Sequence, residues 1–148
     1  MMKCEWQKKI IDNKEAGYCF FTGGISEKKI NYIENELGVI LPESYKFFLG
    51  NYGSGGMFGV EIIGCGYSEI PRVVEMTKFY RKYGLPKDLV VIEDVDEYQY
   101  CLQTSLMNDG ECPVVNWAID DDIIVEDENF SVFFLREICE AEEDWEDE

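Results

Sequence analysis

The chain of 148 residues contains no histidine. This absence excludes a Ser-His-Asp or Cys-His nucleophile pair, a histidine general base and an imidazole metal ligand. Six cysteines are present, but none forms a CxxC pair and no histidine can complete a mixed zinc site. We therefore expect small, mostly buried thiols, with no metal and no cofactor. Catalysis would have to rest on carboxylates or lysine, and we expect the protein not to be an enzyme.

Long apolar runs are also missing. No segment approaches the ~20 consecutive apolar residues that cross a bilayer. The first fifteen residues, MMKCEWQKKIIDNKE, lack the apolar core of a signal peptide. The hydrophobic fraction of 46% and the aromatic fraction of 14% are enough for a hydrophobic core. These features predict one domain, residues 1–148, in the cytoplasm.

Basic residues almost disappear from the second part of the chain. Residues 89–148 contain 20 acidic residues and a single base, Arg136, whereas residues 1–88 are nearly balanced. The net charge of −18 is therefore concentrated in one part of the sequence. Such a chain repels nucleic acids and anionic membranes, so we expect neither as a partner. It attracts a basic partner instead.

Helical spacing dominates the first part of the sequence. Apolar residues recur at helical intervals over residues 3–16, between Ser26 and Gly38, and over residues 42–52. Ser26 is a suitable N-cap and Gly38 a suitable helix stop. A short apolar run over residues 18–21 separates the first two predicted helices.

A glycine-rich segment follows the third predicted helix. Gly53-Ser54-Gly55-Gly56 predicts a turn, and residues 58–63 predict a strand. A phosphate-binding loop follows a strand, opens a helix and carries a lysine, and this segment does none of these. We therefore expect a structural turn, and keep a small-molecule site at this turn as a third hypothesis of function.

The pattern then changes from helical to extended. Pro71 opens a predicted helix over residues 71–83. Period-two patterns predict strands over residues 89–95, 98–104 and 113–118. The first two strands are separated by Asp96-Glu97, which predicts a hairpin. Because helical and extended patterns form separate blocks, the predicted fold is α+β, with a largely antiparallel sheet and helices packed around it.

The end of the chain is acidic. Residues 120–128 predict an acidic loop, and helical spacing returns after Asn129, a suitable N-cap. Residues 137–148 contain eight acids and form an acidic C-terminal tail. Carboxylates at a helix C-terminus oppose the helix dipole. We therefore expect fraying after Ala141 unless the basic face of helix 71–83 holds the tail.

The acidic groups allow several interpretations. The spacing of 120–122 and 126–128 does not match a calcium-binding loop. The carboxylates of residues 93–97 could form a catalytic pair, but a hairpin tip rich in acids is more often a solvated turn. A charged surface that faces a partner is the third interpretation. Four large aromatics lie in or beside this acidic half, mostly as expected core residues, and any exposed member could anchor a partner: Tyr98, Tyr100, Trp117 and Trp145.

One segment carries a family pattern, IxxxExxLGxxLPxxYxxFLxxYGxG. The pattern occupies these positions: Ile30, Glu34, Leu37, Gly38, Leu41, Pro42, Tyr45, Phe48, Leu49, Tyr52, Gly53 and Gly55. Residues 90–93 and 129–135 fit the same family. Over roughly residues 25–136 the chain resembles the SUKH superfamily, the Smi/Knr-like proteins.

The resemblance implies an α+β fold and no catalytic residues. Bacterial members are mostly cytoplasmic immunity proteins that bind and neutralise a cognate polymorphic toxin, often a nuclease, and some are paired with toxins of the LXG type. Toxin contacts vary between members, so the resemblance assigns no contact residue. The oligomeric state stays open.

The leading hypothesis is therefore an immunity protein that binds a basic nuclease domain. Charge asymmetry alone selects nine carboxylates as the toxin-binding surface: Glu93, Asp96, Glu97, Asp120, Asp121, Asp122, Glu126, Asp127 and Glu128. The alternative is a scaffold or regulatory module of the Smi/Knr kind that has no toxin partner.

Overall fold

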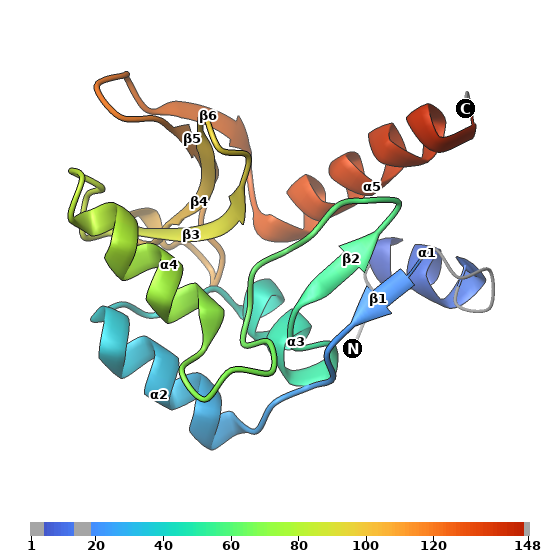
Figure 1. Ribbon diagram of the computed structural model, residues 1–148, viewed down its shortest axis with the longest axis horizontal. Coiled ribbons are helices and arrows are strands. Elements are labelled where there is room, and N and C mark those ends of the chain that lie inside the picture. Colours follow the sequence, from blue (N-terminus) through green and yellow to red (C-terminus); the bar gives the residue numbers. More distant parts are fainter. Residues whose placement is uncertain (1–4, 14–18, 147–148) are drawn as a thin grey trace.

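The computed structural model describes residues 5–13 and 19–146, which form five α-helices and two antiparallel sheets (Figure 1). The elements in chain order are α1 Glu5–Asn13, β1 Cys19–Phe21, α2 Glu27–Leu37, α3 Glu43–Asn51, β2 Gly55–Met57, α4 Arg72–Arg81, β3 Leu89–Asp94, β4 Gln99–Gln103, the 3-10 helix η2 Thr104–Leu106, β5 Val114–Trp117, β6 Ile124–Asp127 and α5 Phe130–Glu146. This arrangement confirms the predicted α+β class. The ends of the first predicted helix, at residues 3–4 and 14–16, and Tyr18 lie outside the described residues.

The ends of α2 follow from local chemistry. The Ser26 hydroxyl accepts a hydrogen bond from the Lys29 amide at 3.2 Å, as an N-cap does. Gly38 adopts a φ of +69°, and its N–H donates to the Glu34 carbonyl at 2.8 Å. Both predicted signals are confirmed.

An aromatic cluster occupies the centre of the core. Phe48 of α3 is fully buried, and its ring lies 5.6 Å from that of Phe134 and 5.7 Å from that of Phe130. Trp6 of α1 lies 6.2 Å from Phe48. The hydroxyl of Tyr45, also buried, donates to the Ile63 carbonyl at 2.6 Å. The first and last helices thus meet through α3.

The strand predicted over residues 58–63 is wrong. The strand in this part of the chain is instead β2, which ends just before Phe58 and pairs antiparallel with β1. Phe58 has a φ of +53°, so the chain turns there. A Cβ atom on Gly55 would lie 2.0 Å from the Phe20 carbonyl oxygen, and one on Gly56 would lie 1.9 Å from the Val60 carbonyl oxygen. Only glycine permits these close approaches. Because glycine has no side chain, the alternation of apolar and polar residues gives no sign of this strand in the sequence.

The larger sheet has the strand order β3-β4-β5-β6. The predicted hairpin is confirmed: β3 pairs with β4, and the Val95 N–H donates to the Tyr98 carbonyl at 3.0 Å across the turn. Helix α4 packs beside β3 (Figure 1), where the Thr77 hydroxyl accepts a hydrogen bond from the Val91 amide at 3.1 Å.

The acidic loop predicted over residues 120–128 contains a strand. In β6, Val125 lies opposite Val115 and Ile124 lies opposite Asn116. The apolar segment Ile123-Ile124-Val125 is short and flanked by acids, so its local pattern resembles a loop. Pairing with β5 supplies the backbone partners that make it a strand.

Helix α5 does not fray after Ala141 but continues to Glu146. The predicted support from helix α4 is also wrong, because Lys78 pairs with Glu36 of α2 instead, at 2.9 Å. Support comes from α1, which lies beside the end of α5 (Figure 1). Lys9 of α1 pairs with Glu142 at 2.6 Å, and the Trp145 ring packs 6.1 Å from that of Phe58.

Candidate partner-binding surface

Two acidic turns leave the larger sheet at the same end. Gln99, the first residue of β4, pairs with Trp117, the last residue of β5. The β3–β4 turn therefore ends where the β5–β6 turn begins. The first turn carries Asp96 and Glu97, and the second carries Asp120–Asp122. We call these five residues the acidic end.

Seven of the nine predicted toxin-binding carboxylates are exposed, namely Asp96, Glu97, Asp120, Asp121, Asp122, Glu126 and Glu128. The acidic end brings five of them together. Glu126 lies on β6, and Glu128 follows the end of β6 that points away from the acidic end. The structure therefore provides one concentrated group of carboxylates and two outlying ones.

Asp94 holds the first acidic turn in place. Its carboxylate accepts hydrogen bonds from the Tyr80 hydroxyl at 3.0 and 3.1 Å and from Gln99 Nε2 at 3.1 Å. The same carboxylate also accepts a hydrogen bond from the backbone amide of Asp96 at 3.0 Å. The predicted set of site residues did not include Asp94, because only the fold reveals that β3, β4 and α4 meet at this side chain.

Backbone geometry explains two of the acids at the acidic end. Asp96 has a φ of +71° and Asp120 a φ of +65°. Aspartate and asparagine adopt this left-handed conformation more readily than most residues do. These two aspartates thus shape the turns in addition to carrying charge, and asparagine is the substitution that removes their charge while preserving the backbone.

Glu93 does not belong to the exposed acidic surface. Its Oε1 atom is buried and has no hydrogen-bond partner among the described residues. Burial, together with the neighbouring carboxyl group of Glu137, raises the pKa of Glu93 to about 9. The side chain is therefore protonated near neutral pH and adds no charge to a toxin-binding surface.

The substitution Glu93→Gln is expected to remove a pH-dependent loss of stability. The pKa of this carboxyl is about 9 in the fold and near 4.5 when unperturbed. Between those values the folded chain holds a proton that the unfolded chain releases, so the contribution of Glu93 to the free energy of unfolding falls as pH rises. Urea denaturation across this window should show the variant gaining stability over the wild type as pH rises. A difference that is constant with pH would contradict the assignment, and Glu97→Gln on the exposed turn serves as the control.

Asp127 is also removed from the exposed surface, by an ion pair. Its buried carboxylate accepts a hydrogen bond from Arg136 Nη2 at 2.8 Å and from Arg136 Nε at 3.2 Å. This bond is the main cause of the raised pKa of Arg136. Arg136 also contacts Glu140 at 3.2 Å and lies over the ring of Phe133. The single base of the second half of the chain therefore neutralises acids of its own chain and fastens β6 to α5.

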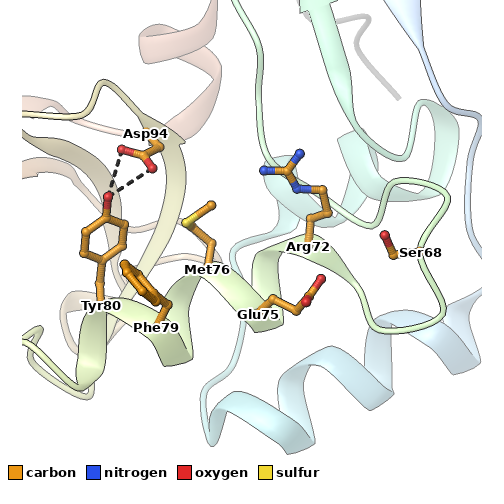
Figure 2. A pocket seen from close by; sticks show the side chains of 7 residues that line it. All are labelled: Ser68, Arg72, Glu75, Met76, Phe79, Tyr80 and Asp94. Carbon is orange, nitrogen blue, oxygen red and sulfur yellow. Dashed lines mark hydrogen bonds between the residues drawn. The ribbon is translucent and has the colours of Figure 1, made fainter.

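An open hollow of about 560 Å³ lies between α4 and the end of β3 (Figure 2). Its lining residues are Ser68, Arg72, Glu75, Met76, Phe79, Tyr80 and Asp94. Figure 2 shows Phe79 and Tyr80 on the side of Asp94, with Arg72 and Ser68 farther away. Because Asp94 also holds the β3–β4 turn, the aromatic part of the hollow borders the acidic end.

The exposed aromatics of this region were missed by the sequence patterns. Phe79 is 47% exposed and Tyr83 55% exposed, and their rings lie 5.3 Å apart. The helix predicted over residues 71–83 includes Tyr83, but α4 ends at Arg81, so Tyr83 lies beyond the helix. Exposed aromatic side chains are typical anchors of protein interfaces.

The four aromatics singled out in the sequence have different environments. Trp117 is buried and packs 5.9 Å from Tyr80, and Tyr98 and Tyr100 are half-buried. Trp145 is exposed but lies near the end of α5. None of the four is therefore an exposed anchor at the acidic end.

Residues 5–13 and 19–146 include no group of three or more histidine, cysteine, aspartate or glutamate side chains arranged to hold a metal ion. In the same part of the chain, no helix has the length and apolar character needed to cross a bilayer. In a comparison with protein families, the family model SUKH_5, described as SMI1-KNR4 cell-wall, matches residues 7–138.

Proposed function

The chain belongs to the SMI1-KNR4, or SUKH, family, and from this membership we propose that it is an immunity protein that binds and neutralises a cognate toxin. The family consists largely of non-enzymatic immunity and interaction domains. We propose that the toxin is of the polymorphic LXG type and that its toxic domain is a basic nuclease. The chain acts by binding and not by catalysis.

The observation that carries this proposal is the acidic end. Five exposed carboxylates project from two adjacent turns, and Arg136, the single base of residues 89–148, is already paired with Asp127. A nuclease presents basic residues to phosphates, so a surface of carboxylates can occupy the same cleft in place of nucleic acid. Opposite charges also accelerate association, from ~10⁵–10⁶ toward ~10⁸–10⁹ M⁻¹s⁻¹ at low salt.

The aromatic part of the hollow complements this charge. Phe79 is exposed in the hollow that Asp94 also lines, and the exposed ring of Tyr83 lies 5.3 Å from that of Phe79, so the pair can supply the apolar contact area that charged residues lack. In this proposal the carboxylates set the rate of encounter, and the aromatic side chains lengthen the lifetime of the complex.

Co-expression tests the proposal directly. The toxic domain encoded by the neighbouring reading frame is expressed from an inducible promoter, with and without this chain. We expect the chain to restore growth, and to form a complex with the toxic domain that survives gel filtration. A toxic domain that still stops growth in the presence of the folded chain contradicts the proposal.

A second function, the scaffold role, is favoured by the description of the matching family model, which refers to SMI1-KNR4 and the cell wall. The two functions differ in their genetic neighbourhood. An adjacent reading frame that encodes an LXG-type toxin supports immunity, and the absence of any toxin gene beside this one supports the scaffold role.

A further inference from the structure

The two edge strands of the larger sheet, β3 and β6, differ in whether their outward backbone groups are hydrogen-bonded. At the β3 edge, the Val91 amide donates to the Thr77 hydroxyl at 3.1 Å and the Ile92 carbonyl accepts from the Ile63 amide at 2.7 Å. At the other edge, β6 pairs only with β5 among the described residues. The outward N–H and C=O groups of β6 are therefore available to another strand.

The side chains of β6 are also uncovered. Ile124 is 60% exposed and Val125 62% exposed, so neither face of the strand is buried at this point. Ile119 and Ile123 of the preceding turn are exposed as well. Charged residues, especially lysine, and proline discourage further pairing at edge strands. The β6 strand has no lysine and no proline, and its charged residues are the acids Glu126 and Asp127. Figure 1 shows the β5–β6 hairpin at the periphery of the molecule.

Charge selects the kind of strand that could pair here. Asp122 precedes the apolar residues of β6, and Glu126 and Glu128 follow them, all exposed. A second copy of this chain would place its own acids against these, and like charges across a strand pair are destabilising. A strand with basic residues at its two ends and apolar residues in the middle would meet acids at both ends of this segment and apolar side chains between them.

We propose that β6 is a docking edge for an extended basic segment of the partner protein, which adds a fifth strand to the sheet. The partner contributes backbone hydrogen bonds to β6, places apolar side chains on Ile124 and Val125, and places lysine or arginine beside Asp122 and Glu126. This inference rests on the proposed function for the identity of the partner and specifies how that partner is recognised.

A synthetic peptide with lysines on both sides of a central run of three valines is the probe, because it matches the acidic ends and the apolar middle of residues 122–126. It is titrated into the ¹⁵N-labelled chain, and amide hydrogen exchange is measured with and without it. We expect exchange of the outward amides of β6 to slow by about tenfold or more, because they gain strand partners. A peptide with N-methyl groups at alternate positions, which removes its donors, should bind about tenfold more weakly. Unchanged exchange in β6, or equal binding of the methylated peptide, overturns the proposal.

Variants and the free chain supply the remaining controls. Ile124→Thr combined with Val125→Thr retains β-propensity and should weaken peptide binding several-fold. Ile40→Thr, at an isoleucine that is 71% exposed before α3, should not. A dimer of the free chain with protected β6 amides would identify a second copy as the occupant and overturn the proposal. Because the peptide contains no toxin sequence, its failure to bind leaves the growth-rescue result standing, and a failed rescue leaves the peptide result standing.

Discussion

Replacing Asp121 and Asp122 by lysine, together with Asp120→Asn, is expected to slow association with the toxic domain by about 10- to 100-fold at low salt. These residues are exposed in the β5–β6 turn, and none of the ion pairs within residues 5–13 and 19–146 involves them. Asparagine is chosen at position 120 because the φ of +65° there suits asparagine better than lysine. The fold should therefore be retained while the local field is reversed.

Stopped-flow mixing with the toxic domain measures this effect. A matched variant carries the same change in net charge at remote exposed acids, as Glu5→Lys, Asp12→Lys and Glu27→Gln. We expect the matched variant to associate only slightly more slowly than the wild type. If both variants slow association equally, net charge and not the acidic end directs the encounter.

The substitution Phe48→Ala is expected to reduce the free energy of unfolding by about 3–5 kcal/mol. Phe48 is fully buried, and its ring lies within 6.2 Å of those of Trp6, Phe130 and Phe134. Removing it leaves a cavity where α1, α3 and α5 meet. Since small domains have a total stability of about 5–15 kcal/mol, the variant should be close to unfolding at 37 °C.

Urea denaturation followed by circular dichroism measures this loss. Phe20→Ala is the matched control, because Phe20 is 64% exposed on β1, and we expect it to cost less than about 1 kcal/mol. Equal losses in the two variants would contradict the placement of the core around Phe48.

Local signals explain what could be predicted from the sequence. Ser26 and Gly38 mark the ends of α2, and the period-two pattern of β3 and β4 marks the hairpin, because each signal lies within a few residues of the feature it specifies. The two missed strands, β2 and β6, depend on distant partners. β2 consists mainly of glycine packed against β1, and β6 becomes a strand only by pairing with β5.

The candidate surface shows the same division. Exposure of Asp120–Asp122 follows from a polar turn, which local sequence indicates. The burial of Glu93, the pairing of Asp127 with Arg136, and the position of Asp94 between α4 and the β3–β4 turn arise from tertiary packing. Composition identified a charged half of the chain, but the fold determines which carboxylates face solvent.

The dependence of association on salt tests the central claim, that the acidic end directs binding to a basic toxin. The association rate constant of the wild-type chain and the toxic domain is measured from low to physiological ionic strength. Because added ions screen exposed charges beyond about 8–10 Å, we expect the rate constant to fall steeply across this range, with a shallower fall for the variant of Asp120–Asp122. A rate constant that is flat with salt, or a slope unchanged by that variant, would contradict the account.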